Sequence, residues 1–388
     1  MRVLHVIPSL ASQTGGPAFA VVESARSLRQ LGVESEIVAT DLPAAANAGA
    51  RRAVTAAELP SGIGNLDVRL FRARPPRRLA FSPGLARRVA AAAGEVDLVH
   101  VHSLYLFPQL AAFVAARRHR VPYLVSLHGS LDPWLRARGR SRKALVDRAW
   151  QRRMLEHAAA LHVTTAEEER LTADVAPAVP RSVVPYGIDW AGFQMLPPPE
   201  EFRRRYLNGW QGPVVLNVGR IAAKKGLDVL VRAVAGLPDA HLVLAGPDDE
   251  GLRASLAQLA FSLGARDRVT FTGMLHRDER LGALAAGDVW ALPSHTENFG
   301  IAVVEAMAAA RPVVVSPGVN LAPDVAAARA GLVVAAEPEA LTRALSALLG
   351  DPERRQGLAA RAREFARQYD WSEVAPRWRS MYMEATRR

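Results

Sequence analysis

The chain has 388 residues, of which 49% are hydrophobic and 22% are charged. This composition is typical of globular proteins, and the length allows two or three domains. The absence of cysteine excludes a disulfide framework, a thiol nucleophile and a cysteine zinc site. No apolar run reaches the ~18 residues that span a bilayer, and Pro8 breaks the first run too early for a signal peptide. We therefore expect a cytoplasmic protein.

The net charge is +11, and most of the excess lies in the first half. Residues 1–199 contain 25 basic and 16 acidic side chains, whereas residues 200–388 contain 24 and 22. A basic half favours an anionic partner, such as a nucleic acid, a membrane surface or a phosphorylated small molecule. An arginine-rich sequence that places arginine at any solvated position explains the excess equally well.

The first half alternates between short apolar runs and helical patterns. A glycine loop at Gly15-Gly16-Pro17 follows the first run, and apolar residues then recur at helical spacing up to Gly32. Strands separated by helices predict a parallel, doubly wound sheet. We expect these strands at Val3–Ile7, Glu36–Ala39, Asp97–Val101, Tyr123–Leu127, Leu161–Thr164 and Ser182–Val184.

The same pattern starts again after a proline-rich segment, Pro197-Pro198-Pro199. A helix is expected at Leu227–Leu237, and strands at Val214–Val218, His241–Ala245, Val269–Phe271, Val289–Leu292, Pro312–Val315 and Leu332–Val334. The prediction is an α/β protein of two Rossmann-like domains, residues 1–190 and 191–370. Ligands of such sheets bind beyond the carboxyl ends of the strands. A ligand in a cleft between the domains would then meet the loops after Ile7, Leu127, Val218, Ala245 and Leu292.

The common nucleotide-binding signatures are missing. Gly62 and Gly64 have the first spacing of G-x-G-x-x-G, but Asp67 occupies the third position, and no P-loop is present. No D-x-D sequence occurs, which removes a common carboxylate anchor for nucleotide-bound Mg²⁺. The fold allows nucleotides, but not through the usual NAD or ATP loops.

Two loops of the second half combine charge with helix starts. In Asn217–Gly226, Gly219 permits a tight turn, and Arg220 and Lys225 reach a helix N-terminus that favours a diphosphate. The alternative to phosphate binding is that Arg220 caps the sheet and Lys225 is solvated. In Pro293–Ala308, Glu297 on the loop and Glu305 on the helix suit ligand hydroxyls and a ribose diol. A surface pair at accidental spacing is the alternative there.

Histidines follow two strands of the first half. His128 would enter the cleft at the end of a strand, although a lone histidine is more often structural. His100 and His102 form a His-x-His pair, but no nearby Cys, Asp or Glu completes a metal site, so we interpret them as structural.

These motifs together resemble the family-4 retaining glycosyltransferases of GT-B fold. The resemblance rests on Gly219-Arg220 with Lys225-Gly226, and on Glu297 and Glu305 as an E-x7-E motif. It covers essentially the whole chain, with further matches at Val184–Asp189, Phe271-Thr272-Gly273 and Asp288–Ser294. The family implies an acceptor-binding first domain, a donor-binding second domain and a C-terminal helix, residues 371–388, that crosses back.

The resemblance also implies roles for single residues. Arg220 and Lys225 match the residues that bind the donor diphosphate, Glu297 the one that contacts the sugar, and Glu305 the one that holds the ribose. His128 matches a histidine near the reacting sugar, and with Arg220, Lys225 and Glu297 it forms the expected catalytic set. The other expected donor-binding positions are Gly15, Gly16, Gly219, Gly246, Met274, Asn298, Phe299 and Gly300. Two positions depart from the family: Tyr186 stands where Asn is usual, and Asn320 lies where a glycine-rich turn ending in Glu is common.

The implied reaction moves a sugar from a UDP- or GDP-sugar to a glycan with retention, and needs no metal or other cofactor. Arg220, Lys225 and the helix start near Gly300 would stabilise the leaving diphosphate. The acceptor, expected to be lipid-linked and part of surface polysaccharide synthesis, would bind the basic first domain. Segment 134–153, with seven arginines and Lys143, would contact anionic lipid at the inner membrane face, unless it is only a solvated arginine-rich helix. An epimerase or phosphorylase of the same fold, or a nucleic-acid binder, are the other candidates, although no nucleic-acid partner is expected.

Overall fold

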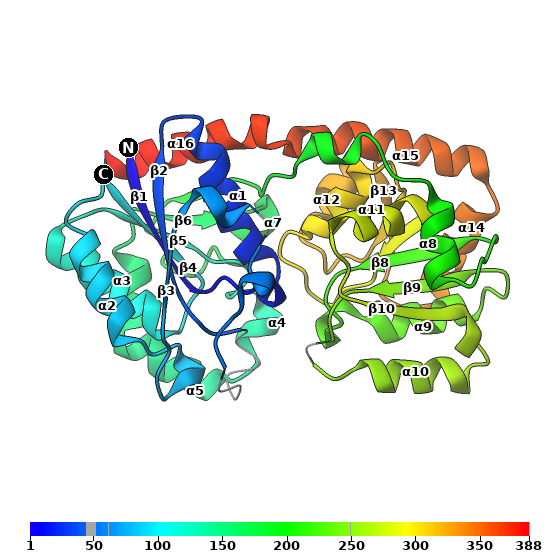
Figure 1. Cartoon of the computed structure of the whole chain (residues 1–388), viewed down its shortest axis with the longest axis horizontal. Helices are drawn as coiled ribbons and strands as arrows, with labels where there is room; N and C mark the ends of the chain where they lie inside the picture. Colours follow the sequence, from blue (N-terminus) through cyan, green and yellow to red (C-terminus); the bar gives the residue numbers. More distant parts are fainter. Residues whose placement is uncertain (44–51, 61, 249, 388) are drawn as a thin grey trace. The chain divides into compact units, whose positions relative to one another are not determined.

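The computed structural model describes residues 1–43, 52–60, 62–248 and 250–387. The chain forms two compact units (Figure 1). Unit 1 contains residues 1–187 and 371–388, and unit 2 contains residues 188–370.

Unit 1 is built on a seven-stranded parallel sheet in the order β3-β2-β1-β4-β5-β6-β7. All six expected strands are present, with ends shifted by one or two residues. The edge strand β3 was not expected, because its residues are at most half-buried and its apolar signal is weak. The strands are β1 (Arg2–Ser9), β2 (Glu34–Thr40), β3 (Asp67–Phe71), β4 (Leu98–His102), β5 (Tyr123–Ser126), β6 (Ala160–Val163) and β7 (Arg181–Val183).

Helices cover both faces of this sheet. They are α1 (Gly16–Arg29), α2 (Pro83–Ala92), α3 (Phe107–His119), α4 (Pro133–Arg136), α5 (Arg140–Val146), α6 (Arg152–Glu156), α7 (Ala166–Leu171) and α16 (Trp371–Thr386). The basic segment 134–153 is not one continuous helix, because α4 ends at Arg136 and α5 begins at Arg140. From there α5, a π-helical turn at Asp147–Gln151 and α6 follow one another without a break.

The two faces of the sheet differ in chemistry. Successive strand residues point to opposite faces, so Val99 and Val101 of β4 enter an apolar core with α2 and α3. His100 and His102 point to the other face, where α16, red in Figure 1, packs against β4 and α1. The C-terminal helix is therefore part of unit 1.

Unit 2 has a six-stranded parallel sheet in the order β10-β9-β8-β11-β12-β13. Its strands are β8 (Val214–Val218), β9 (His241–Ala245), β10 (Val269–Gly273), β11 (Val289–Leu292), β12 (Val313–Val315) and β13 (Gly331–Val333). Its helices are α8 (Pro199–Tyr206), α9 (Leu227–Ala235), α10 (Arg253–Ser262), α11 (Arg277–Ala286), α12 (Ile301–Ala308), α13 (Ala322–Ala327), α14 (Pro338–Leu349) and α15 (Pro352–Ala366). The predicted fold class, two parallel-sheet α/β domains, is confirmed.

The strand order of each sheet reverses at one place. In unit 1 the reversal lies between β1 and β4, and in unit 2 between β8 and β11. Such a switch point opens a crevice at the carboxyl ends of the strands, where ligands of doubly wound sheets bind. Among the described residues, no helix has both the length and the apolar character needed to cross a membrane.

Candidate functional site

The loops after β8 and β11 interlock at the switch point of unit 2. Asn217 is buried at the end of β8 and donates from Nδ2 to the carbonyl of Ala291 on β11, at 2.7 Å. The His295 N–H donates to the Lys224 carbonyl at 2.8 Å. A side chain at Gly226, which adopts a left-handed φ of 61°, would clash with the carbonyl of Pro293. The two loops therefore form one rigid edge.

Lys225 is buried in this edge, with 8% of its surface exposed. Its Nζ occupies the space where a Cβ at Gly219 would lie, so Gly219 is needed for close approach as well as for its φ of 148°. The pKa of Lys225 is lowered to about 8, chiefly by burial; the charge of Glu297 opposes this shift, and the charges of Lys224 and Arg220 add to it. The solvated Lys225 considered from sequence is therefore wrong.

Glu297 lies opposite these cations. Its Oε1 is 3.4 Å from Lys224 Nζ, whereas its Oε2 is buried and accepts no hydrogen bond from the described residues. Burial pushes the pKa of Glu297 upward, but the charges of Lys224, Lys225 and Arg220 outweigh burial and lower the pKa. Glu297 is thus a carboxylate with one oxygen held and one available.

The loop after β12 fixes the backbone of Glu297. The Glu297 N–H donates to the Gly318 carbonyl at 2.8 Å, and the Asn320 N–H donates to the Glu297 carbonyl at 2.9 Å. A short parallel bridge joins Glu297 to Val319. The segment around Asn320, which departs from the family pattern, therefore supports Glu297 through the main chain.

Glu305 is on α12, and 13% of its side chain is exposed. Its Oε1 is 3.1 Å from Arg280 on α11, which supplies the partner that its apolar neighbours Val303 and Val304 cannot. The idea of an accidental surface pair is therefore wrong for both glutamates, since 16% of the Glu297 side chain is exposed.

The remaining predicted donor residues of unit 2 lie at the same edge or near it. Gly246 directly follows β9 and packs against the Gly219 backbone. Phe299 is buried, and Gly300 precedes α12 with a left-handed φ of 76°. Asn298 lies between them and Glu297, and Met274 follows β10 and is half exposed.

In unit 1, Gly15 and Gly16 lie where β1 leads into α1. Gly15 has φ 88° and ψ −151°, a conformation restricted to glycine, and it caps α1 without a side-chain hydrogen bond. Pro17 occupies the first turn, as expected. The first backbone N–H groups of α1 are thus uncovered by a side-chain cap, which suits an anion.

His128 follows β5, but its ring is turned inward. Its Nδ1 is hydrogen-bonded to the Tyr186 hydroxyl, and its Nε2 lies 3.1 Å from His102 Nδ1. Burial lowers the pKa of His128 to about 3, so the ring is neutral. Both ring nitrogens are engaged inside unit 1, and the ring offers no free nitrogen to a substrate.

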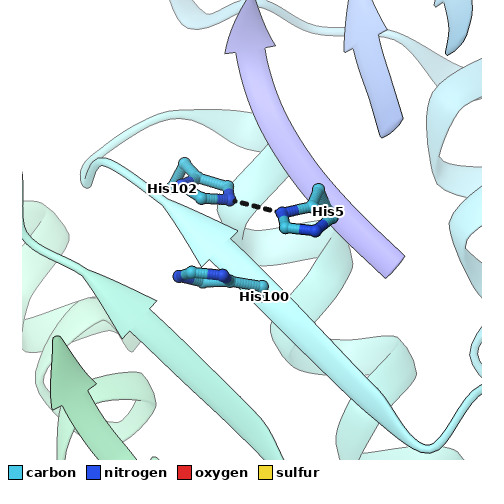
Figure 2. Close-up of side chains that lie close together, drawn as sticks. All are labelled: His5, His100 and His102. Carbon is cyan, nitrogen blue, oxygen red and sulfur yellow. Dashed lines mark hydrogen bonds between the residues drawn. The ribbon is translucent and has the colours of Figure 1, made fainter. Parts of the chain in front are cut away.

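His5 joins the pair His100 and His102, which sequence reasoning treated as incomplete. The ligand atoms of the three rings lie within 4.8 Å of one another, and Figure 2 shows His5 of β1 bonded to His102 of β4. Both nitrogens of His100 are bonded, to Ser126 and Tyr382, and both of His102 to His5 and His128. Five of the six ring nitrogens are thus hydrogen-bonded, and His5 Nε2 has no partner among the described residues.

Three features of the site were not foreseen. They are the Lys224–Glu297 ion pair, the Arg280–Glu305 ion pair and the His128–Tyr186 hydrogen bond. Each of them joins residues far apart in the chain. Only Lys224 could have been suspected from the sequence, because it is a cation next to Lys225 in a loop after a strand. The other two depend on how helices and strands are placed, which no spacing reveals.

Two family models match the chain. "Glycosyl transferases group 1" matches residues 199–365, and "Glycosyl transferase 4-like domain" matches residues 15–187. The D-inositol 3-phosphate glycosyltransferase of Xylanimonas cellulosilytica is 32% identical and covers 96% of this chain and 93% of its own length. The enzyme of the same name from Kineococcus radiotolerans is also 32% identical, over 96% and 91%.

Solved structures share the fold at lower identity. Anabaena HepE in complex with UDP and glucose has a TM-score of 0.80 and 20% identity, covering 99% of both chains. WaaG, a glycosyltransferase involved in lipopolysaccharide biosynthesis, has a TM-score of 0.71 and 18% identity, covering 98% of this chain and 99% of its own.

Proposed function

Because the chain belongs to the family-4, group 1 glycosyltransferases of GT-B fold, we propose that it transfers a sugar from a UDP- or GDP-sugar with retention of configuration. Family membership makes the protein a glycosyltransferase rather than an epimerase, a phosphorylase or a nucleic-acid binder. UDP is the first nucleotide to test, since HepE was solved with UDP and with UDP-glucose.

The observation that carries the proposal is the free oxygen of Glu297. A buried carboxylate oxygen without a donor costs free energy unless a ligand supplies the hydrogen bond. A sugar hydroxyl is such a donor. The neighbouring cations Arg220 and Lys225 suit the diphosphate of the same ligand, and Glu305 suits the ribose diol.

In the proposed mechanism, charge stabilisation replaces a protein nucleophile. Breaking the bond between the sugar and the diphosphate builds negative charge on the leaving phosphate. Lys225 and Arg220, with the N-terminus of α12 that follows Gly300, would stabilise that charge, each prearranged donor by about 3 kcal/mol. The acceptor would attack from the side of the leaving group. We propose that these groups suffice without a metal ion.

The test is the variant Glu297→Gln, which keeps the size of the side chain and removes its charge. We expect kcat/KM to fall about a hundredfold while UDP still binds, because Glu297 would contact the sugar and not the nucleotide. Glu339→Gln, an exposed glutamate of α14, is the matched control. Transfer by Glu297→Gln at the rate of the control would contradict the proposal.

We further propose that the acceptor is a lipid-linked glycan and that unit 1 contacts anionic lipid through segment 134–153. Five of its arginines, Arg138, Arg140, Arg142, Arg148 and Arg153, are exposed and form no ion pair within the described part of the chain. Leu145 beside them is 70% exposed. Cations around an exposed apolar residue suit an anionic membrane surface.

Co-sedimentation with vesicles tests this contact. Binding should require anionic lipid and fall in the variant Arg140→Gln/Arg142→Gln/Arg148→Gln, because screened electrostatic attraction would hold the protein there. Equal binding to neutral and anionic vesicles would contradict it.

A second candidate acceptor is a phosphorylated polyol. The relatives at 32% identity are named D-inositol 3-phosphate glycosyltransferases, and a basic unit 1 also suits a small phosphate ester. Incubation of the enzyme and UDP-glucose with D-inositol 3-phosphate, and separately with a polyprenyl-diphosphate-linked glycan, decides between the two acceptors.

A further inference from the structure

Five of the ten histidines gather on one face of the unit 1 sheet. His5, His100, His102 and His162 are at most 1% exposed, and His128 is partly buried beside them. They come from β1, β4, β6 and the end of β5, and α16 covers them with Trp378 and Tyr382. We call these five residues the histidine layer.

Three of these rings and one tyrosine form a continuous chain of hydrogen bonds. His5 Nδ1 lies 3.1 Å from His102 Nε2, and His102 Nδ1 lies 3.1 Å from His128 Nε2. His128 Nδ1 is bonded to the Tyr186 hydroxyl. The chain ends at His5 Nε2, which is buried and has no partner among the described residues.

The proton count restricts this chain. A neutral imidazole carries one N–H, and burial lowers the pKa of His5 and His128 to about 3 and that of His102 well below 6.5, so all three rings are neutral. Each hydrogen bond between two rings uses one proton. Either every ring carries its proton on Nδ1 and Tyr186 accepts, or every ring carries it on Nε2 and Tyr186 donates. The three rings therefore share one tautomer.

At its other end, this chain of hydrogen bonds reaches the loop that follows β5. His128 and Gly129 both adopt left-handed conformations, with φ of 49° and 72°, at the carboxyl end of β5. The Gly129 N–H donates to Glu168 Oε1 at 2.9 Å, which holds the far side of the turn. Tyr186 is buried two residues before the chain enters unit 2. Its hydroxyl is the outer anchor of the His128 ring.

We propose that Tyr186 is a positioning residue for sugar transfer, which fixes His128 and its loop by setting the shared tautomer of His5, His102 and His128. This inference rests on the proposed function for its kinetic consequence, but its structural part does not. Since both ring nitrogens of His128 are engaged, the ring acts as a fixed support of the loop and moves no proton.

The first test is ¹⁵N NMR of the imidazole rings in the full chain without ligand. We expect His5, His102 and His128 to show one common tautomer in the wild type, and Tyr186→Phe to shift the His128 ring to a mixture of tautomers. The matched control is Tyr123→Phe, which removes a buried hydroxyl bonded to the Met154 carbonyl in the same unit. Different tautomers among the three wild-type rings, or no change at His128 in Tyr186→Phe, would overturn the proposal.

The second test is kinetic. Tyr186→Phe should lower kcat about tenfold, the equivalent of one lost buried hydrogen bond. UDP affinity should be unchanged, because the expected nucleotide residues other than Gly15 and Gly16 belong to unit 2. Tyr123→Phe should keep the wild-type kcat. A merely structural role would lower the thermal midpoint of both variants and leave both kcat values alike, which would refute positioning.

A pair of variants at His102 covers the case in which Tyr186→Phe does not fold. The amide of asparagine lies near the Nδ1 position of an imidazole, and that of glutamine near the Nε2 position. His102→Asn therefore keeps the bond to His128 and should retain more activity than His102→Gln, which keeps the bond to His5. The reverse order would contradict the proposal. Failure of wild-type UDP binding would instead refute the proposed function and leave the tautomer result standing.

Discussion

Among single residues, Lys225 stands out, because the edge formed by the loops after β8 and β11 disfavours its charged form. Lys225 is buried beside Lys224 and Arg220, and the carboxylate of Glu297 interacts with all three charges. Burial of a cation favours its neutral form, which is why the pKa of Lys225 falls to about 8. A bound diphosphate would reverse this effect and hold the proton on Lys225.

This electrostatic arrangement predicts a pH dependence of nucleotide binding. Below pH 8 Lys225 is charged and attracts the diphosphate, and above pH 8 it loses its proton, so UDP affinity should fall by up to tenfold per pH unit. Titration calorimetry from pH 7 to 9.5 measures this. Lys225→Ala should bind weakly at every pH with a flatter profile. The same slope in both proteins would show that another group titrates.

A second prediction concerns Arg280, which holds one oxygen of Glu305 at 3.1 Å. Arg280→Gln should weaken UDP binding about tenfold, because a partly buried carboxylate loses its orientation and its charged partner. Arg277→Gln is the matched control on the same helix, since its partner Asp189 is more exposed. Equal UDP affinities of the two variants would exclude a role for Arg280.

At the scale of elements, the histidine layer joins the central strands of unit 1 to α16. Trp378 Nε1 donates to the Pro185 carbonyl at 2.9 Å, and the Tyr382 hydroxyl is 2.9 Å from His100 Nδ1. His100 continues through Ser126 to His162, which is bonded to the Val184 carbonyl. Helix α16 is therefore bonded to this network of buried imidazoles through Tyr382, and to the Pro185 carbonyl through Trp378.

Acid should destabilise this arrangement. The unfolded chain takes up protons at histidine near pH 6.5, whereas burial lowers the pKa of His5 to about 3 and of His162 to about 4. Stability is thus retained above pH 6.5 and lost as the pH falls below it, by about 1.4 kcal/mol per buried histidine and pH unit.

Urea unfolding at pH 7.0, 6.0 and 5.5 measures this loss. We expect the unfolding free energy to drop by several kcal/mol, with an uptake of more than two protons on unfolding at pH 5.5. A free energy that is constant over this range would show that the imidazoles are not held neutral.

The sequence predicts the positions of strands and helices better than it predicts which residues of different elements come into contact. Buried parallel strands such as β8, β9 and β11 are near-continuous apolar runs and were located to the residue. The edge strand β3 was missed because it buries little apolar surface. Lys225 and Glu297 could be proposed as site residues because local motifs mark them. Their supports, among them Arg280 and the loop at Asn320, lie on other elements, and only the folded chain brings these together.

At the scale of the whole molecule, each unit carries its own doubly wound sheet and its own switch point. The charged residues expected to bind the donor belong to unit 2, whereas the basic excess belongs to the first half of the chain. On this basis we propose that unit 2 binds the nucleotide and unit 1 the acceptor.

We propose that the edge formed by the loops after β8 and β11 binds a nucleoside diphosphate. Titration calorimetry of the whole chain with UDP, GDP, ADP and CDP in the presence of EDTA tests it most directly, with Lys225→Ala and Glu305→Ala as site variants and Glu339→Gln as control. We expect that UDP or GDP binds without added metal, that both site variants weaken this binding at least tenfold, and that the control binds as the wild type does. Binding of none of the four nucleotides, or equal binding by wild type and both site variants, would contradict it.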